Sequence, residues 1–551
     1  MIKISIVLLS LITAFAHPLF AGTPGSTLRL PAIIGDHMVL QSGTPDPIWG
    51  WAAPGADVTV RFVDGKGNSL ASATAKAGAG GRWSATLPAL HPGIAGTLRV
   101  SAGAESRDIE DVLTGEDWLC GGQSNMEFPM ARVLNAKQEI ARADDPQMRL
   151  FLVAEQPAMA PLEDLTSGSW TLCTPKTVSP FSAVGYYFGK HLRTSLNEPV
   201  GLIGSYWGGT SAQVWISMDT LRQVASLNKY ASGYNRVAKE YPGGADQFLK
   251  DYADYKEKVS QWNIGRVRDK DYQSALGAWR KASAEAASHQ QPQPPAPNYS
   301  IPAPVGPAGG GHAVASFLYN GMIAPLAPFA LRGAIWFQAD GNLGHPQDYG
   351  ILIKTLINDW RTQWKSDLPF YYVEMNNMRD YPQKEPVQYN NLSVLREQQQ
   401  AALELPETGV ACSIDVGLPQ PEPHFPNKKP VGDRLALLAL NNLYGQKCAA
   451  NSPAYKSFQV DGNKLRIQFT DAAGLRLIAG HPFAGFAIKG ATGDWKWAEG
   501  SIQGDSIVLW NDDVPQPVAA RYAWAANPVI SIENGAGLPL RPFRTDTQSP
   551  Q

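Results

Sequence analysis

The middle of the chain, from about residue 111 to residue 450, repeats a short apolar segment, a polar loop that contains glycine, and a helical segment. This alternation is typical of a parallel sheet covered by helices. The strands are expected at residues 117–120, 199–205, 332–338, 369–374 and 409–415, and the helices at residues 183–195, 347–364, 390–405 and 430–444. The pattern predicts an α/β fold in which the loops at the carboxyl ends of the strands face one crevice.

Both flanks of this α/β region have a different pattern. Short alternating segments are separated there by turn dipeptides such as Asp64-Gly65 and Asp461-Gly462. A period of two residues interrupted by such turns is typical of antiparallel hairpins and β-sandwiches. At roughly 150 residues per domain, the length predicts about three or four folding units. We expect a signal peptide over residues 1–21, an N-terminal β domain over 22–106, an α/β domain over 107–450 and a C-terminal β domain over 451–551.

The α/β domain contains a long insertion between its second and third strands, at about residues 220–312. A charged helical stretch at about 247–287 is followed by a proline-rich segment at 291–297 and three glycines at 309–311. Runs of proline and glycine are typical of extended surface connections. The insertion is therefore predicted to be a surface connection or a lid.

The first residues resemble an export signal. Lys3 is the only charged residue before a largely apolar run at 4–16, and small residues allow cleavage after Ala16 or Ala21. This order is typical of a secretory signal peptide, and the run is too short to span a bilayer comfortably. Later segments contain no run of about 18 apolar residues, so no membrane span is expected. The mature protein is predicted to be secreted or periplasmic.

The charge balance bears on the class of partner. The chain has 47 Lys and Arg residues against 49 Asp and Glu residues, and charged residues make up only 17% of it. A nucleic-acid-binding protein needs a positive face that displaces counterions, so this balance argues against such a partner. The 16 Trp, 19 Tyr, 52 Gly and 43 Pro residues instead suit a secreted, β-rich protein that handles sugars.

The four cysteines have no spacing typical of a metal site, and no His-Glu-x-x-His motif occurs. Neither a metal nor another cofactor is therefore expected. An even number of cysteines in an oxidising compartment permits disulfides. Buried free thiols fit equally well, because apolar segments end at two of the cysteines. The residues concerned are Cys120, Cys173, Cys412 and Cys448, of which Cys120 and Cys412 end such segments.

The first polar loop of the α/β domain lies in the segment WLCGGQSNME at 118–127. Ser124 stands there after two glycines, at the start of an expected helix. A serine becomes a nucleophile when a base removes its proton, and the N–H groups of a helix N-terminus stabilise developing negative charge. Ser124 is therefore a candidate nucleophile. The alternative is a serine that only caps the helix.

Two further strands end in loops with candidate oxyanion donors. In the loop YWGGTS at 206–211, Gly208 and Gly209 allow bare backbone N–H groups to approach a ligand. The loop FQADGN at 337–342 carries the side-chain amides of Gln338 and Asn342, which can also donate to an oxyanion. The alternative interpretations are a tight turn for the glycines and a fixed loop for the amides.

The last loop, DVGLPQPEPHFPNK at 415–428, contains the candidate base His424. Glu422 or Asp415 could orient its ring and stabilise the imidazolium, as the third member of a catalytic triad does. His345, near the third loop, is the competing candidate base. Together the four loops provide a nucleophile, N–H groups, amide donors and a base, which are the requirements of acyl transfer.

These loops resemble the motifs of the sialate O-acetylesterase family, within the SGNH hydrolases. Similarity extends over nearly the whole mature chain and rests on the joint occurrence of several segments. They are LPAI at 30–33, DHMVLQ at 36–41, IWGWA at 48–52, FSAVGYYFG at 181–189, LYNGMIAPL at 318–326, GLP at 537–539 and PFRTD at 542–546. The resemblance implies a flavodoxin-like α/β/α SGNH esterase domain over 107–450, accessory antiparallel β-sandwich domains and no metal.

The family motifs also imply roles for individual residues. Gly-Gln-Ser-Asn makes Ser124 the nucleophile, Trp-Gly-Gly-Thr makes Gly208 or Gly209 an oxyanion donor, and His-x-x-Asn-Lys makes His424 the base. Candidates for substrate contact stand beside them in the same motifs. These are Gln123, Asn125 and Trp207.

Two segments depart from the family pattern. The third loop has Ala339 and Asp340 where the family usually has Gly and Glu, and the loop before His424 is rich in proline and one residue longer. The third triad member is therefore open between Glu422, Asp415 and a Ser–His dyad.

The resemblance implies an exported serine esterase that removes O-acetyl groups from a carbohydrate. The sugar is open between 9-O-acetylated sialic acid and an acetylated plant hemicellulose such as xyloglucan or xylan. A sialate enzyme would benefit from a basic residue that faces the carboxylate of the sugar, and only Lys428 and Lys429 stand near the loops. The alternative from another class is a non-catalytic carbohydrate-binding protein.

Overall fold

The computed structural model describes residues 27–288, 291, 294–378, 383–387, 390–417 and 423–546. The predicted signal peptide lies outside these residues. So does Glu422, the first candidate for the third member of the triad.

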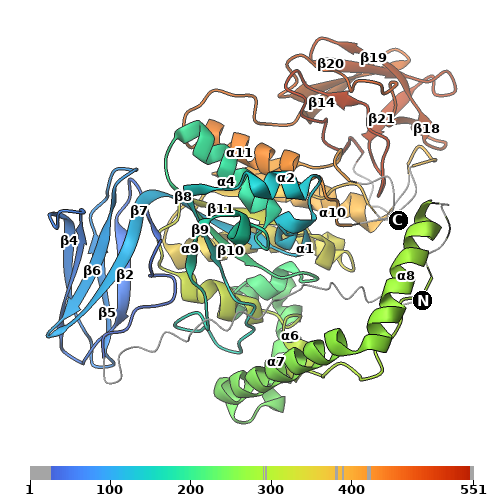
Figure 1. The fold of residues 1–551 in the computed structure, drawn as a ribbon. Helices are drawn as coiled ribbons and strands as arrows, with labels where there is room; N and C mark the ends of the chain where they lie inside the picture. The colour runs from blue at the N-terminus through green and yellow to red at the C-terminus, as the bar shows by residue number, and fades with distance from the viewer. Residues whose placement is uncertain are drawn as a thin grey trace.

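A mainly parallel sheet forms the centre of the molecule (Figure 1). Its strand order is β13-β12-β11-β7-β10-β8-β9, and only the β8–β9 pair is antiparallel. The strands are β7 Glu105–Gly122, β8 Asp145–Leu152, β9 Trp170–Cys173, β10 Val200–Tyr206, β11 Gly333–Phe337, β12 Phe370–Glu374 and β13 Thr408–Cys412. The predicted α/β fold class, with a mainly parallel sheet, is therefore confirmed.

Each of the five predicted strands corresponds to a strand of this sheet, within a few residues at most ends. The strands β8 and β9 were not predicted. In β8 the charged residue Arg149 interrupts the apolar run. Its side chain is nevertheless buried, because the guanidinium donates to the Asp111 carboxylate at 2.7 Å. Pairing with the sheet, rather than a purely apolar sequence, makes this segment a strand.

Helices cover both faces of the central sheet. Gly185 of α4 lies beside Cys120 of β7, since a Cβ on this glycine would be 3.1 Å from the thiol. The next residue of β7, Gly121, lies beside α9, since a Cβ there would be 3.3 Å from Trp360. Successive residues of a strand point to opposite faces, so α4 and α9 lie on opposite sides. The helices of this region are α1 Ser124–Glu127, α2 Ala136–Ala141, α3 Pro175–Val178, α4 Ala183–Leu196, α9 Tyr349–Trp364, α10 Asn391–Gln399 and α11 Lys429–Asn442.

The helix α11 packs directly on α4. A Cβ on Gly432 of α11 would lie only 2.6 Å from the Cβ of Tyr187, so glycine permits this close approach. The predicted helix at 390–405 is α-helical only to Gln399 and continues as a 3-10 helix over Gln400–Glu404.

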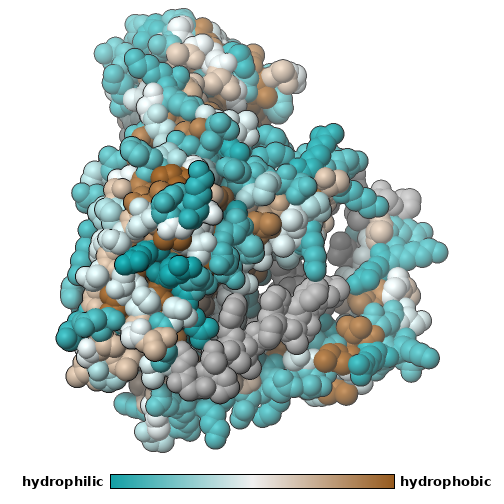
Figure 2. Space-filling view, turned by 60° about the vertical axis from the view of Figure 1, so that its left-hand side comes forward, coloured by the Kyte–Doolittle hydropathy of each residue, from teal (hydrophilic) through white to brown (hydrophobic). Residues whose placement is uncertain are grey.

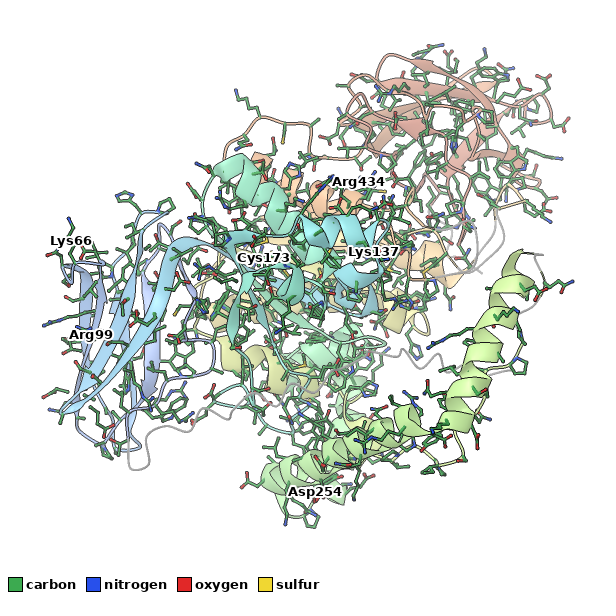
Figure 3. All side chains as sticks on the ribbon, viewed as in Figure 1. Lys66, Arg99, Lys137, Cys173, Asp254 and Arg434 are labelled. Atoms are coloured by element: carbon green, nitrogen blue, oxygen red, sulfur yellow. The ribbon has the colours of Figure 1, made fainter. Side chains whose placement is uncertain are left out.

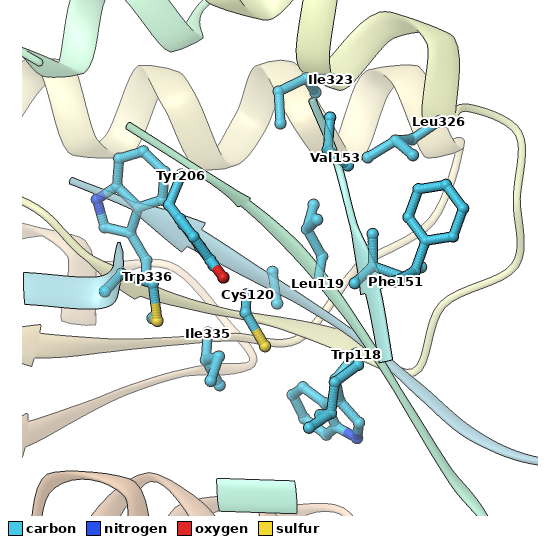
Figure 4. Close-up of a cluster of buried hydrophobic side chains, with 14 of the residues drawn as sticks. Trp118, Leu119, Cys120, Phe151, Val153, Tyr206, Ile323, Leu326, Ile335 and Trp336 are labelled. Atoms are coloured by element: carbon cyan, nitrogen blue, oxygen red, sulfur yellow. The ribbon is translucent and has the colours of Figure 1, made fainter. Parts of the chain in front are cut away.

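Aromatic and aliphatic side chains fill the space around the central strands. Figure 4 shows Trp118 and Cys120 of β7 with Phe151 of β8 and Ile335 of β11, and all four are fully buried. The Trp118 ring also meets Phe188 of α4 edge to face at 4.9 Å. Several of the many tryptophans therefore build the core rather than a sugar-binding surface.

The N-terminal strands are joined to the central sheet through β7. Its first half pairs with β6 and its second half with β10 and β11, so the boundary proposed at residue 106 falls inside a single strand. The strands before it are β1 Val39–Gln41, β2 Asp46–Trp51, β3 Asp57–Val63, β4 Ser69–Lys76, β5 Arg82–Leu87 and β6 Ala95–Ala102. Pairing is antiparallel between β2 and β5, β3 and β4, and β3 and β6.

The C-terminal residues form antiparallel sheets around a separate hydrophobic cluster that includes Phe486 and Tyr522. Two sheets have four strands each, in the orders β14-β15-β20-β19 and β18-β17-β21-β23, and β16 pairs with β22 in a third sheet. The strands are β14 Ala454–Asp461, β15 Lys464–Thr470, β16 Arg476–Leu477, β17 Phe486–Gly490, β18 Lys496–Trp497, β19 Glu499–Gln503, β20 Ser506–Trp510, β21 Pro517–Tyr522, β22 Ile532–Glu533 and β23 Phe543–Arg544.

The predicted insertion is mainly helical, and in Figure 1 α7 and α8 extend from the body of the molecule as an arm. The charged stretch expected as one helical segment is two helices, because the chain bends at Asp269, whose side chain accepts from the Tyr272 N–H at 2.9 Å. The helices are α5 Met218–Gln223, α6 Ala231–Glu240, α7 Gly244–Arg268 and α8 Lys270–Ser288. The return segment is tied to this arm at Pro294, whose carbonyl accepts from the Trp279 indole at 2.8 Å.

The face drawn in Figure 2 is mostly hydrophilic, with separate hydrophobic patches. Within the described ranges, none of the helices combines the length and the apolar character that a bilayer crossing requires. All four cysteines are free thiols. Cys173, labelled in Figure 3, is buried, as are Cys120 and Cys412, and Cys448 is half-buried. The choice left open between disulfides and thiols is therefore resolved in favour of thiols.

Candidate active site

Three of the predicted loops leave the central sheet side by side. Gly122 at the end of β7 is opposite Tyr206 of β10 and Phe337 of β11. Backbone bonds continue beyond the strands, since the Gln123 N–H donates to the Phe337 carbonyl at 3.0 Å and the Trp207 N–H donates to the Gly122 carbonyl at 3.1 Å. The sheet register therefore brings together the loops after β7, β10 and β11.

Ser124 is the first residue of the short helix α1 and is 5% exposed. The turn before it requires glycine, because Gly122 has a φ of +144° and a Cβ there would lie 2.3 Å from the Phe337 carbonyl oxygen. Gly208 lies directly beside the serine, since a Cβ on Gly208 would be 3.3 Å from the Ser124 Cβ. The first and second predicted loops therefore meet at Ser124.

The loop that carries His424 is tied to α1 through Asn125. The Asn125 amide donates to the Pro423 carbonyl at 3.1 Å, and its oxygen accepts from the Lys428 ammonium. The bonded groups lie on both sides of the half-buried His424 in the sequence, so they tie the segment that contains it to α1. The competing base, His345, is exposed.

Lys428, one of two lysines considered for a sugar carboxylate, is fully buried. Its ammonium lies 3.5 Å from the centroid of the Phe425 ring, which is a favourable cation–π geometry. The neighbouring Lys429 is exposed and pairs with Asp433. Lys428 therefore braces the histidine loop, a role that its place in the sequence did not indicate.

Asp415 forms an ion pair with Arg434. Both of its carboxylate oxygens accept from Arg434 at 2.6 Å, and Figure 3 labels this arginine on α11. The ion pair ties the start of the histidine loop to the helix that follows it. Its commitment to Arg434 weakens the candidacy of Asp415 as third member, and Glu422 remains the first choice from the sequence.

Gln338 is fully engaged by protein groups. Its amide nitrogen lies within hydrogen-bond distance of the Thr210 carbonyl at 3.1 Å, the Asn342 amide oxygen at 2.9 Å and the Gln123 amide oxygen at 3.2 Å. An amide nitrogen has only two hydrogens to donate. These contacts join three loops, and the role of Gln338 as an oxyanion donor stays a prediction.

The side-chain amide of Asn342 donates fewer hydrogen bonds than that of Gln338. Its oxygen accepts from the Ala212 N–H at 2.8 Å and its nitrogen donates to the Gln213 side chain at 3.0 Å. One donated bond leaves the second amide hydrogen available for another acceptor. Asn342 therefore keeps its candidacy as an oxyanion donor.

Two residues expected to contact substrate are buried and bonded to neighbouring loops. Gln123 is 2% exposed, and its amide oxygen accepts from the Gly341 N–H at 3.0 Å. Asn125 is also 2% exposed and is committed to the histidine loop. The third expected contact, Trp207, is half-buried, and its ring stacks on His312 with centroids 5.2 Å apart.

The altered third loop has a glycine, Gly341, at its closest contact with the second loop. A Cβ on Gly341 would lie 2.2 Å from the Thr210 carbonyl oxygen, so a side chain there would separate the second and third loops. Ala339, which replaces the usual glycine, is buried without a comparable constraint on its φ of −174°. The departure from the family motif therefore leaves the close contact between the loops intact.

The two glycines of the second loop differ in their contacts. The Gly208 N–H donates to the Glu127 carboxylate at 2.6 Å, whereas Gly209 is exposed, has a φ of +74° and has open space where a Cβ would stand. The Gly208 donor is thus occupied by a carboxylate. The N–H groups of Ser124 and Gly209 are the better candidates for the oxyanion.

Two glutamates near the site were missed by sequence analysis. Burial raises the pKa of Glu127, and the Gly208 N–H, His424 and Arg132 partly oppose this rise. Burial, followed by the negative charge of Glu127, raises the pKa of Glu155 to about 8, while Lys256 of α7 opposes it. The signal for Glu127 was its position three residues after Ser124, which places both residues on one side of a helix.

The insertion reaches the second loop through a hydrophobic cluster. Phe248 and Tyr252 of α7 pack there with Phe317, and Trp207 packs against the same cluster. The arm is therefore anchored beside Gly208. Among the described residues, no group of three or more His, Cys, Asp or Glu side chains could hold a metal ion.

The bonds of Asn125 predict an effect on both stability and activity. Asn125→Ala is expected to lower the free energy of unfolding by about 2 kcal/mol, because it leaves the Lys428 ammonium and the Pro423 carbonyl without this partner. It should also lower kcat about tenfold or more, since the His424 loop loses its tie to α1. Urea denaturation and acetate release would test this. The exposed Asn228 provides a control variant, Asn228→Ala, and equal behaviour of the two variants would contradict the prediction.

Comparisons with known proteins point to one family. No family model matches the chain. The sialate O-acetylesterase of Mus musculus is 29% identical over 456 residues, which cover 77% of this chain and 75% of the mouse protein, and that of Homo sapiens is 26% identical, covering 77% and 72%. The crystal structure of a carbohydrate acetylesterase from Xanthomonas citri is 32% identical. It covers 95% of this chain and 100% of its own, with a TM-score of 0.75.

Proposed function

Because this chain belongs to the sialate O-acetylesterase family of carbohydrate acetylesterases, which are carboxylic ester hydrolases, we propose that it is an exported serine esterase that removes O-acetyl groups from a carbohydrate. The observation that carries the proposal is the approach of three loops at Ser124. Gly208 lies beside the serine, and Asn125 ties the His424 loop to the same helix. A non-catalytic carbohydrate-binding protein would not need this arrangement.

In the proposed reaction, the Ser124 hydroxyl attacks the acetyl carbonyl while His424 accepts its proton. The tetrahedral intermediate carries an oxyanion, which the N–H groups of Ser124 and Gly209 and the second amide hydrogen of Asn342 would stabilise. The intermediate then collapses, and the sugar hydroxyl leaves with the proton from His424. Water, activated by His424, hydrolyses the acetyl-enzyme and releases acetate.

The third member of the triad is proposed to be Glu422, which stands two residues before His424. Asp415 is the second choice, since Arg434 holds both of its carboxylate oxygens. With neither residue in that role, Ser124 and His424 would act as a dyad. We further propose that residues 107–450 form an SGNH esterase domain and that the flanking β regions are sandwich domains.

The two lysines near the loops bear on the choice of sugar. Lys428 is buried against Phe425, and Lys429 pairs with Asp433, so neither is presented to the carboxylate of a sialic acid. This observation favours a neutral acetylated sugar, such as that of a plant hemicellulose, over 9-O-acetylated sialic acid. The sialate activity, which the names of the mammalian relatives suggest, is the second candidate.

Measurement of acetate release from acetylated xyloglucan, acetylated xylan and 9-O-acetylated sialic acid tests this choice. We expect kcat/KM to be at least about tenfold higher for one of the neutral sugars, because an unpaired sugar carboxylate pays a desolvation cost of about 1–3 kcal/mol. A tenfold preference for the sialic acid would assign the sialate activity instead. Absence of acetate release from all three substrates would contradict the esterase proposal.

A further inference from the structure

Glu127 is the acidic residue that the proposed reaction leaves without a role, although it stands next to the nucleophile. It ends the same short helix that Ser124 begins. Its carboxylate accepts from the Gly208 N–H at 2.6 Å. A Cβ on Gly208 would be 2.9 Å from this carboxylate and 3.3 Å from the Ser124 Cβ. The backbone of Gly208 is therefore adjacent to both side chains.

The bond to Gly208 controls the geometry of the second loop. Gly208 and Gly209 are adjacent, and the φ of +74° at Gly209 belongs to a tight turn that starts from the residue held by Glu127. A turn fixed at its first residue orients the N–H of the next one, which is the donor proposed for the oxyanion. Glu127 can therefore act on the oxyanion site without contacting substrate.

The carboxylate also has an electrostatic relation to the base. Arg132 and the imidazolium form of His424 oppose the rise in the pKa of Glu127, and the charge of Glu127 contributes to the raised pKa of Glu155. The positive charge of Lys256 on α7 opposes the rise in the pKa of Glu155. A negative charge in this position favours the imidazolium that His424 forms when it accepts the proton of Ser124.

We propose that Glu127 is a positioning residue of the esterase reaction, which fixes the Gly208–Gly209 turn beside Ser124 and places a negative charge toward His424. The proposal rests on the proposed function of Ser124 and His424. It assigns two separable effects to one carboxylate. The hydrogen bond fixes the loop, and the charge stabilises the imidazolium.

Two variants separate these effects. Glu127→Gln retains an amide oxygen that can accept from Gly208 but removes the charge, and Glu127→Ala removes both. We expect kcat to fall by about tenfold in Glu127→Gln and by about a hundredfold in Glu127→Ala, with KM changed less than about threefold in both. Removing the negative charge removes a group that favours the imidazolium form of the base. The acid limb of the pH profile of kcat/KM should therefore move to lower pH by about half a unit or more in both variants.

The matched control is Glu404→Gln, which removes a carboxylate that pairs with Lys354 on the surface, and wild-type kinetics are expected. Thermal unfolding of every variant reports on the fold. Unchanged kcat and an unmoved acid limb in both Glu127 variants would overturn the proposal, as would a loss of kcat that follows the unfolding temperature while the acid limb stays in place. Activity retained by Ser124→Ala would overturn the proposed function, whereas an inactive Ser124→Ala with a wild-type Glu127→Gln would overturn this inference alone.

Discussion

Replacing Ser124 with alanine is expected to lower kcat for acetate release by at least about a thousandfold. The acetyl-enzyme cannot form without the hydroxyl, and removal of the nucleophile from a serine hydrolase leaves only the contribution of the oxyanion site and of binding. The change removes a single oxygen from a side chain that is 5% exposed, so the fold should be retained. The measurement is acetate release from 4-nitrophenyl acetate and from an acetylated polysaccharide, with thermal unfolding followed in parallel.

The exposed serine Ser167 supplies the control for this experiment. Ser167→Ala lies outside the loops of the site and should have wild-type activity. The wild-type protein is mixed with 4-nitrophenyl acetate and the reaction is quenched rapidly. Mass spectrometry should then detect an acetyl group on Ser124. Wild-type turnover by Ser124→Ala, or acetylation at a different residue, would end the assignment of the nucleophile.

Replacing His424 with asparagine should also lower kcat by at least about a thousandfold. Nucleophile and base act as one unit, so the loss of either removes nearly the same rate enhancement. The pH dependence should change together with the rate, because the acid limb of kcat/KM reports the base of the free enzyme. We expect this limb to disappear from the residual activity of His424→Asn.

His345→Asn is the matched variant, since His345 is the histidine that the sequence left as an alternative base. It is exposed in the structure, whereas the His424 loop is tied to α1 by Asn125. Wild-type activity is therefore expected for His345→Asn. Inverted results, with His345→Asn inactive and His424→Asn active, would move the base to the third loop.

The parallel strands of the central sheet could be predicted because each is a continuous apolar segment that ends in a polar loop. The strand β10, Val200–Tyr206, is buried at every position and was expected within one residue of its observed ends. The strands β8 and β9 could not be found in this way. Their pairing with β10 and with each other compensates for the polar residues in them, and that compensation exists only in the assembled sheet.

In the candidate site, the positions of the loops could be predicted, whereas the contacts of their side chains could not. The loops that contain Ser124, Gly208 and His424 were predicted from their positions after strands, and the structure brings them together. The contacts of the individual polar side chains were not predictable. Gln338 was expected to donate to an oxyanion, but its amide nitrogen contacts Gln123 and Thr210, from two other loops, and Asn342 in its own loop.

The sequence by itself determined the class of fold, the order of the loops and the residue types that meet at the carboxyl edge of the sheet. Periodicity and motifs carry this information because they depend on the local backbone and on neighbours in the chain. The tertiary structure decided which polar groups are used up and which are left for chemistry. A buried donor must find an acceptor, and the acceptors of Asn125, Gly208 and Lys428 come from other segments of the chain. For that reason the brace at Lys428 and the role proposed for Glu127 became visible only in the folded molecule.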